Sequence, residues 1–117
     1  MQADRNMNIL MHIRDYCMEI DYTMNAFGRD YETFVANSIY QNAVALCVLQ
    51  IGELTTHFTD EFKAVHNKVP WNQIRALRNI IAHNYGRIDK EILWETLISD
   101  IPELNDYCCQ IITEYKD

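Results

Sequence analysis

Apolar side chains recur every three or four residues along nearly the whole chain, and this spacing constrains the fold more than any other feature. Side chains three and four positions apart share one face of an α-helix, whereas a half-buried strand would alternate every second residue. The first series falls within a helix expected from residue 4 to residue 27: Leu10, Ile13, Cys17, Ile20, Met24 and Phe27. Only two prolines and three glycines interrupt 117 residues, so the sequence predicts an all-α fold.

Residues that commonly start or stop helices separate the apolar series. Gly28 should cap the end of the first helix, and Asp30 can cap a short turn through Phe34. Pro70 suits the first turn of a third helix, which Gly86 should end. These signals leave short connections between the helices.

The second and fourth helices are expected to be long. The second should run from residue 36 to residue 66, and its apolar stretch from 43 to 51 predicts a central position covered on more than one side. Gly52 would allow another helix to approach closely because it lacks a side chain. Asp89 can cap the fourth helix, which Pro102 should kink or split between residues 99 and 102. Four such helices predict an antiparallel, up-and-down bundle.

Length and composition predict one domain over residues 1–117. No apolar run approaches the roughly 20 residues that span a bilayer, and residues 1–8 lack a signal-peptide core, so we expect a cytoplasmic location with no membrane partner.

No two cysteines form a C-x-x-C pair. We expect them to be small hydrophobic residues rather than zinc ligands or disulfides: Cys17, Cys47, Cys108 and Cys109.

The charge is unevenly distributed along this acidic chain. The formal net charge is −7, which argues against a general nucleic-acid coat. Residues 63–90 nevertheless contain six basic side chains and a single acid, Asp89. The positive charge therefore gathers around one segment, Arg78-Asn79-Ile80-Ile81-Ala82-His83-Asn84-Tyr85.

This segment combines a guanidinium with an imidazole. Because residues five apart on an ideal helix differ by about 140° around its axis, Arg78 and His83 would face different directions. Either the helix unwinds before Gly86 and swings His83 around, or the site uses groups from two chains. We favour a two-fold dimer that places Arg78 of one subunit near His83 of the other.

Arginine and histidine without a carboxylate cluster or cysteine nucleophile suit the cleavage of RNA. RNA supplies its own nucleophile, the 2′-hydroxyl, while histidine can act as general base or acid and arginine can stabilise the phosphate's developing charge. No metal or cofactor is required. Taken alone, the pair has a simpler interpretation as surface or interface residues. Glu53 and His57 are spaced to ligate a metal, but a pair on a solvated helix face is the preferred interpretation.

With this motif and the helices predicted around it, the chain resembles the HepT-like toxins of the HEPN superfamily. Their signature of Arg, four residues, His, one residue and Tyr is matched without departure by Arg78, His83 and Tyr85. The flanking segments also match: Ala43-Val44, Ile51-Gly52-Glu53, Pro70-Trp71, and Ile88-Asp89 followed by Trp94.

The resemblance implies a four- to five-helix HEPN bundle that forms a homodimer with its catalytic cleft at the two-fold interface. It implies a type VII-like toxin with metal-independent endoribonuclease activity, in which Arg78 and His83 are catalytic and Asn79 supports them. Its antitoxin would be a minimal nucleotidyltransferase that silences the toxin by transferring AMP to Tyr85.

Two further expectations concern binding. We assign Arg75 and Arg87 to phosphate contacts with the RNA substrate. The alternative function, from a different class, is a non-catalytic helical adaptor whose cleft binds a nucleotide or a nucleotidyltransferase partner.

Overall fold

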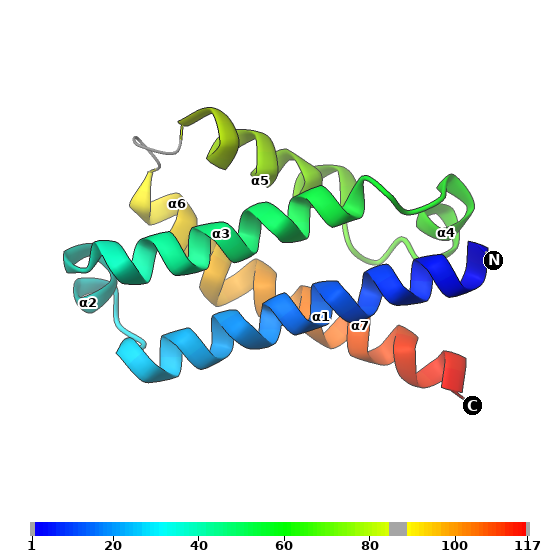
Figure 1. Ribbon diagram of the computed structural model, residues 1–117, viewed down its shortest axis with the longest axis horizontal. Helices are drawn as coiled ribbons and strands as arrows, with labels where there is room; N and C mark the ends of the chain where they lie inside the picture. The colour runs from blue at the N-terminus through cyan, green and yellow to red at the C-terminus, as the bar shows by residue number, and fades with distance from the viewer. Residues whose placement is uncertain (1, 85–88, 117) are drawn as a thin grey trace.

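The computed structural model has the all-α, antiparallel architecture that the periodicity predicts. It describes the backbone of residues 2–84 and 89–116, and the side chains in those ranges except residues 2–4, 80, 82–84 and 116. Successive long helical segments run in opposite directions, and both marked ends of the chain lie at the same end of the bundle (Figure 1).

The helix that spans Ser38–Thr55 lies at the centre of the bundle. In chain order the elements are α1 (Gln2–Phe27), α2 (Tyr31–Ala36), α3 (Ser38–Thr55), α4 (Asp60–Val65), α5 (Trp71–Asn84), α6 (Lys90–Glu95), the π-helical turn η2 (Thr96–Asp100) and α7 (Ile101–Lys116). Helix α3 packs against both α1 and α5, and α1 also packs against α7 (Figure 1). The prediction of a centrally placed second long helix is therefore confirmed.

The junction between α1 and α2 follows the predicted capping residues. Gly28 has a φ of 125°, and its N–H donates to the carbonyl of Met24 at 2.8 Å. The carboxylate of Asp30 accepts a hydrogen bond from the backbone N–H of Thr33 at 3.0 Å. Hydrogen bonds from the hydroxyl and the N–H of Thr33 lower the pKa of Asp30, because they favour the charged form of the carboxylate.

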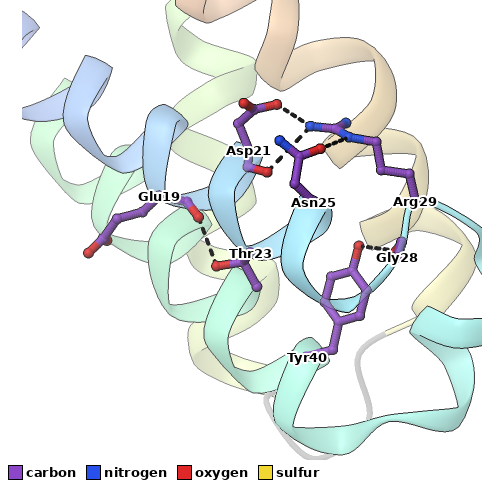
Figure 2. A network of polar contacts seen from close by, with 7 residues as sticks. All are labelled: Glu19, Asp21, Thr23, Asn25, Gly28, Arg29 and Tyr40. Atoms are coloured by element: carbon purple, nitrogen blue, oxygen red, sulfur yellow. Dashed lines mark hydrogen bonds and ion pairs between the residues drawn. The ribbon is translucent and has the colours of Figure 1, made fainter.

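A polar network fixes the end of α1 against the start of α3 (Figure 2). Arg29 donates from Nε to the side-chain oxygen of Asn25 at 2.6 Å and forms an ion pair with Asp21. The hydroxyl of Tyr40, on α3, donates to the carbonyl of Gly28 at 3.0 Å. Arg29 is thus bonded to the helix that precedes it and does not form part of the positive segment around Arg78.

The expected helix from residue 36 to residue 66 is wrong, because α3 ends at Thr55. The hydroxyls of Thr55 and Thr56 donate to carbonyls three residues earlier, at 2.7 Å each, so side chains compete with the helical backbone pattern. Thr59 then caps α4 by accepting from the N–H of Phe62, and it exchanges hydrogen bonds with Asn6 of α1.

The irregularity predicted near Pro102 is present. Within η2, the N–H of Ile101 donates to the carbonyl of Thr96, five residues earlier, which is the hydrogen-bond pattern of a π-helix. Asp89 caps α6 as predicted, accepting from the N–H groups of Glu91 and Ile92 at 2.9 and 3.2 Å. The predicted end of the third helix at Gly86 lies outside the described residues.

The core contains most of the predicted apolar positions. In α1, Leu10, Ile13, Cys17, Ile20 and Met24 are all buried. Phe27, the last expected member of this series, is instead 39% exposed. Large apolar side chains of other elements are exposed as well: Ile39, Leu46, Val65, Ile92 and Tyr115. No helix in the described ranges combines the length and apolarity needed to cross a membrane.

Three of the four cysteines are buried, as expected of small hydrophobic residues. Cys17, Cys47 and Cys108 lie in the core, and Cys109 is exposed; all four are free thiols. Burial disfavours the thiolate and raises the pKa of Cys17 and of Cys47 to about 12. These thiols therefore stay protonated near neutral pH and are poor nucleophiles.

Candidate active site

Arg78 lies on α5, where its guanidinium is held by partners from two helices. Its Nε donates to Oε2 of Glu53, on α3, at 2.6 Å. Its Nη1 donates to Oδ1 of the neighbouring Asn79 at 2.7 Å. The Arg78 side chain is still 39% exposed, so the held guanidinium remains accessible to an anion.

Gly52 allows α5 to approach α3 at this point. A Cβ atom built on Gly52 would lie 2.6 Å from Cβ of Arg78, 3.1 Å from its backbone N and 3.2 Å from the carbonyl oxygen of Ile74. Real Cβ atoms do not approach other atoms as closely as 2.6 Å, so only glycine fits here without a shift of the helices. The close approach of another helix that the sequence predicted at Gly52 is confirmed.

The backbone of α5 is helical through His83 and Asn84, up to the last residue that the structure describes before residue 89. Unwinding of the helix before His83 therefore does not occur. Positions 78 and 83 are separated by about 140° around the axis of such a helix. The side chain of His83 lies outside the described residues, and so do Tyr85 and Arg87 as a whole.

The described basic residues of the 63–90 window do not all lie beside Arg78. Lys63 lies on α4 beside Asp60, with their charged atoms 3.9 Å apart, and Lys68 precedes α5. Helix α4 lies at the opposite end of α5 from Asn84 (Figure 1). Arg75 is exposed on α5, one turn before Asn79, so the structure places Arg75 and Arg78 on the same helix but leaves Lys63 at the far end.

The sequence interpretation missed Glu53 as a partner of Arg78. As a possible ligand this carboxylate was considered with His57, one helical turn away, whereas the structure pairs it with a side chain 25 positions later. Within the described residues, no group of three or more His, Cys, Asp or Glu side chains is arranged to hold a metal ion. The available signal was the adjacency of Gly52 and Glu53, because a close helix approach beside an acid favours a cross-helix ion pair.

Comparison with known proteins assigns the family. The family described as "Ribonuclease HepT-like" matches residues 9–111, which is nearly the whole bundle. The chain belongs to the HepT-like ribonuclease family. The HEPN superfamily fold expected from Arg78, His83 and Tyr85 is consistent with the helical bundle described above.

Curated relatives of this HepT-like chain carry ribonuclease names. "Putative RNase TTE0752" of Caldanaerobacter subterraneus subsp. tengcongensis is 33% identical over 89 residues, covering 76% of this chain and 80% of the relative. "Putative RNase MJ1380" of Methanocaldococcus jannaschii is 33% identical over 75 residues, covering 64% and 69%. "Probable ribonuclease HepT" of Thermococcus cleftensis is 32% identical over 74 residues, covering 63% and 67%. No solved structure matches the chain significantly.

Proposed function

We propose that this HepT-like protein is the toxin of a type VII-like toxin–antitoxin system and cleaves RNA in the cytoplasm without a metal ion. The observation that carries the proposal is the held, accessible guanidinium of Arg78, in a member of a ribonuclease family. A guanidinium is suited to bind phosphate through two parallel N–H bonds. Arg75 and Arg87 would add further contacts to the RNA backbone.

The reaction uses the substrate's own nucleophile. The 2′-oxygen of one nucleotide attacks the adjacent phosphorus, and the bond from phosphorus to the 5′-oxygen breaks. The attacking hydroxyl gives up its proton and the leaving 5′-oxygen takes one up; His83 carries out one of these two transfers. Arg78 stabilises the negative charge that develops on the phosphate oxygens, and Asn79 supports its orientation. The products are a 2′,3′-cyclic phosphate and a 5′-hydroxyl end.

The helical backbone of α5 supports a site shared between two chains. Because α5 continues past His83, positions 78 and 83 point to different sides of one helix, and a single copy does not readily direct both to one phosphate. In a two-fold dimer, Arg78 of one subunit would meet His83 of the other. Light scattering at micromolar concentration should therefore give the mass of a dimer, and a monomer would count against the shared site.

An exposed apolar stripe supports the same dimer. Ile39 and Leu46 of α3 are 68% and 53% exposed. Ile39 and Leu46 lie seven residues apart, and Glu53 follows seven residues later. All three positions therefore lie on one face of α3, and the exposed apolar residues are on the same face as Glu53, which pairs with Arg78. Covering this stripe with a second copy would bury apolar surface and bring the copies together near Arg78.

The catalytic proposal is tested first by chelating divalent metal ions and then by removing the 2′-hydroxyl of the substrate. In excess EDTA, the purified protein should cleave RNA at an unchanged rate. An otherwise identical oligonucleotide with 2′-deoxyribose at the cleaved nucleotide should stay intact, because it lacks the attacking hydroxyl. Cleavage of the deoxy-substituted bond, or loss of activity in EDTA, would contradict the mechanism. Intact RNA throughout, with tight binding of a nucleotide or nucleotidyltransferase, would favour the adaptor function.

We also propose that a minimal nucleotidyltransferase antitoxin silences the protein at Tyr85. The tyrosine oxygen would bond to the α-phosphorus of ATP as its proton is released to solvent, and pyrophosphate would leave. The attached nucleotide would place bulk and negative charge two residues from His83 and compete with the RNA phosphate for Arg78.

The Tyr85 proposal is tested by mass spectrometry after co-expression with such a nucleotidyltransferase. The wild-type chain should gain the mass of AMP, and Tyr85→Phe should gain none. Tyr22, which is 76% exposed on α1, provides a matched control, since Tyr22→Phe should be modified as fully as wild type. Undiminished modification of Tyr85→Phe would assign the acceptor to another residue.

A further inference from the structure

Glu53 forms a cross-helix ion pair that differs from the other ion pairs of the described residues. The pairs Arg14–Asp15 and Lys63–Asp60 each lie within one helix, and Arg29 pairs with the end of the helix it follows. Glu53 instead reaches from α3 to Arg78 on α5, with 2.6 Å between Oε2 and Nε. It also contacts the one arginine of the chain that stands in the Arg-x4-His motif.

From this geometry we infer that Glu53 is a positioning residue for Arg78, an inference that rests on the proposed ribonuclease function. Glu53 fixes the Nε edge of the guanidinium, and Asn79 fixes Nη1. The first atoms of the Arg78 side chain are fixed as well, because its Cβ and backbone N lie against Gly52. Both ends of the side chain are therefore set before RNA binds.

The ion pair between Glu53 and Arg78 contributes too little to the stability of the fold for stability to be its main effect. The side chains of Arg78 and Glu53 are 39% and 45% exposed, and ion pairs this exposed contribute little to folding because solvent screens them. A misplacement of about 1 Å in a catalytic group, in contrast, can lower a rate by about 100-fold. The larger expected effect of Glu53 is thus on the orientation of Arg78 during the reaction.

The carboxylate also opposes simple RNA binding. Its negative charge offsets the positive charge of Arg78 and repels phosphate, so a residue selected only to bind RNA would not be acidic. Removing Glu53 should therefore leave the affinity for RNA unchanged or slightly higher. An orienting role is instead expected to affect kcat, because it is exerted mainly in the transition state.

The inference is tested with Glu53→Ala and Glu53→Gln. Glu53→Ala should lower kcat by about 10- to 100-fold with KM for RNA within about twofold of wild type. Glu53→Gln keeps an oxygen that can accept from Nε, so it should retain clearly more activity than Glu53→Ala. Glu95→Ala, which removes an exposed carboxylate from α6, should leave both constants unchanged.

Two further measurements separate positioning from general stability. In an Arg78→Ala background, Glu53→Ala should cause no additional loss of cleavage, because Glu53 acts through Arg78. In NMR spectra of the wild-type protein, the Arg78 Nε–H should exchange slowly with solvent, and Glu53→Ala should remove that protection. These spectra report on the ion pair whether or not RNA is cleaved.

The outcomes distinguish the inference from the function on which it rests. Wild-type protein that cleaves no RNA would remove the proposed function and with it this role of Glu53. An active wild type with an equally active Glu53→Ala would overturn the positioning role alone. Faster cleavage of RNA by Glu53→Ala would also overturn it, since Glu53 would then act as an anion that competes with phosphate.

Discussion

Replacement of His83 with alanine should lower the rate of RNA cleavage by about 10²- to 10⁴-fold, which is the usual contribution of a general acid or base. Arg78→Lys should also be strongly impaired, although it keeps the charge. Lysine lacks the planar fork that can hold phosphate while Nε is bonded to Glu53. Both variants should fold, because each replaces a polar side chain and removes no apolar side chain from the core.

His12 provides a matched control for His83. It is exposed on α1, so His12→Ala removes an imidazole of the same kind at a distance along the chain from the motif. The measurement is single-turnover cleavage of one labelled RNA in EDTA by all three variants, after circular dichroism has shown equal helicity. Equal rates for His83→Ala and wild type would remove His83 from the mechanism.

Gly52→Ala should both destabilise the bundle and impair cleavage. The added Cβ would lie 2.6 Å from Cβ of Arg78 and close to the backbone of α5, so the two helices must separate. Overpacking of this kind costs about 1–3 kcal/mol, offset in part by alanine's advantage over glycine in a helix of about 1 kcal/mol. We expect a lower Tm and, because Arg78 is displaced, a loss of cleavage of about 100-fold.

Gly28→Ala separates these two effects. Gly28 has a φ of 125°, which alanine adopts only at a cost of about 1–3 kcal/mol, so this variant should also be destabilised. It lies at the end of α1, where its neighbours are Asp30 and Thr33 rather than Arg78. Measured well below both Tm values, Gly28→Ala should cleave RNA like wild type, whereas Gly52→Ala should not. Full activity of Gly52→Ala would show that the close approach of α5 does not matter for cleavage.

The fold could be predicted from the sequence because each helix carries its own periodicity and caps. Gly28, Asp30 and Asp89 act locally, within a few residues of the backbone groups they satisfy, so their roles are visible in the sequence. The end of α3 was missed because the apolar spacing continues past Thr55. The hydroxyls of Thr55 and Thr56 donate to backbone carbonyls at this point, and Asn6 accepts a hydrogen bond from the N–H of Thr59, so the helix is interrupted.

The candidate site could be predicted only in part, because only some of its contacts are between residues close together in the sequence. Arg78 and Asn79 are adjacent, so the motif already places them together, and the structure joins them by a hydrogen bond. Glu53 lies 25 positions earlier, and its pairing with Arg78 depends on the distance between two helices. Gly52 allows that short distance. The sequence shows only that another helix can approach closely at Gly52; it does not show which side chain of that helix will lie beside Glu53.

The most direct test of a phosphodiester site shared by two chains is subunit mixing. Arg78→Ala and His83→Ala should each retain at most about 1% of wild-type activity alone. After co-expression of differently tagged copies, random pairing makes about half of the dimers mixed, and each mixed dimer has one intact site of two, so about a quarter of wild-type activity should return. Mixed dimers that are verified by native mass spectrometry and remain inactive would contradict a site built from Arg78 of one subunit and His83 of the other.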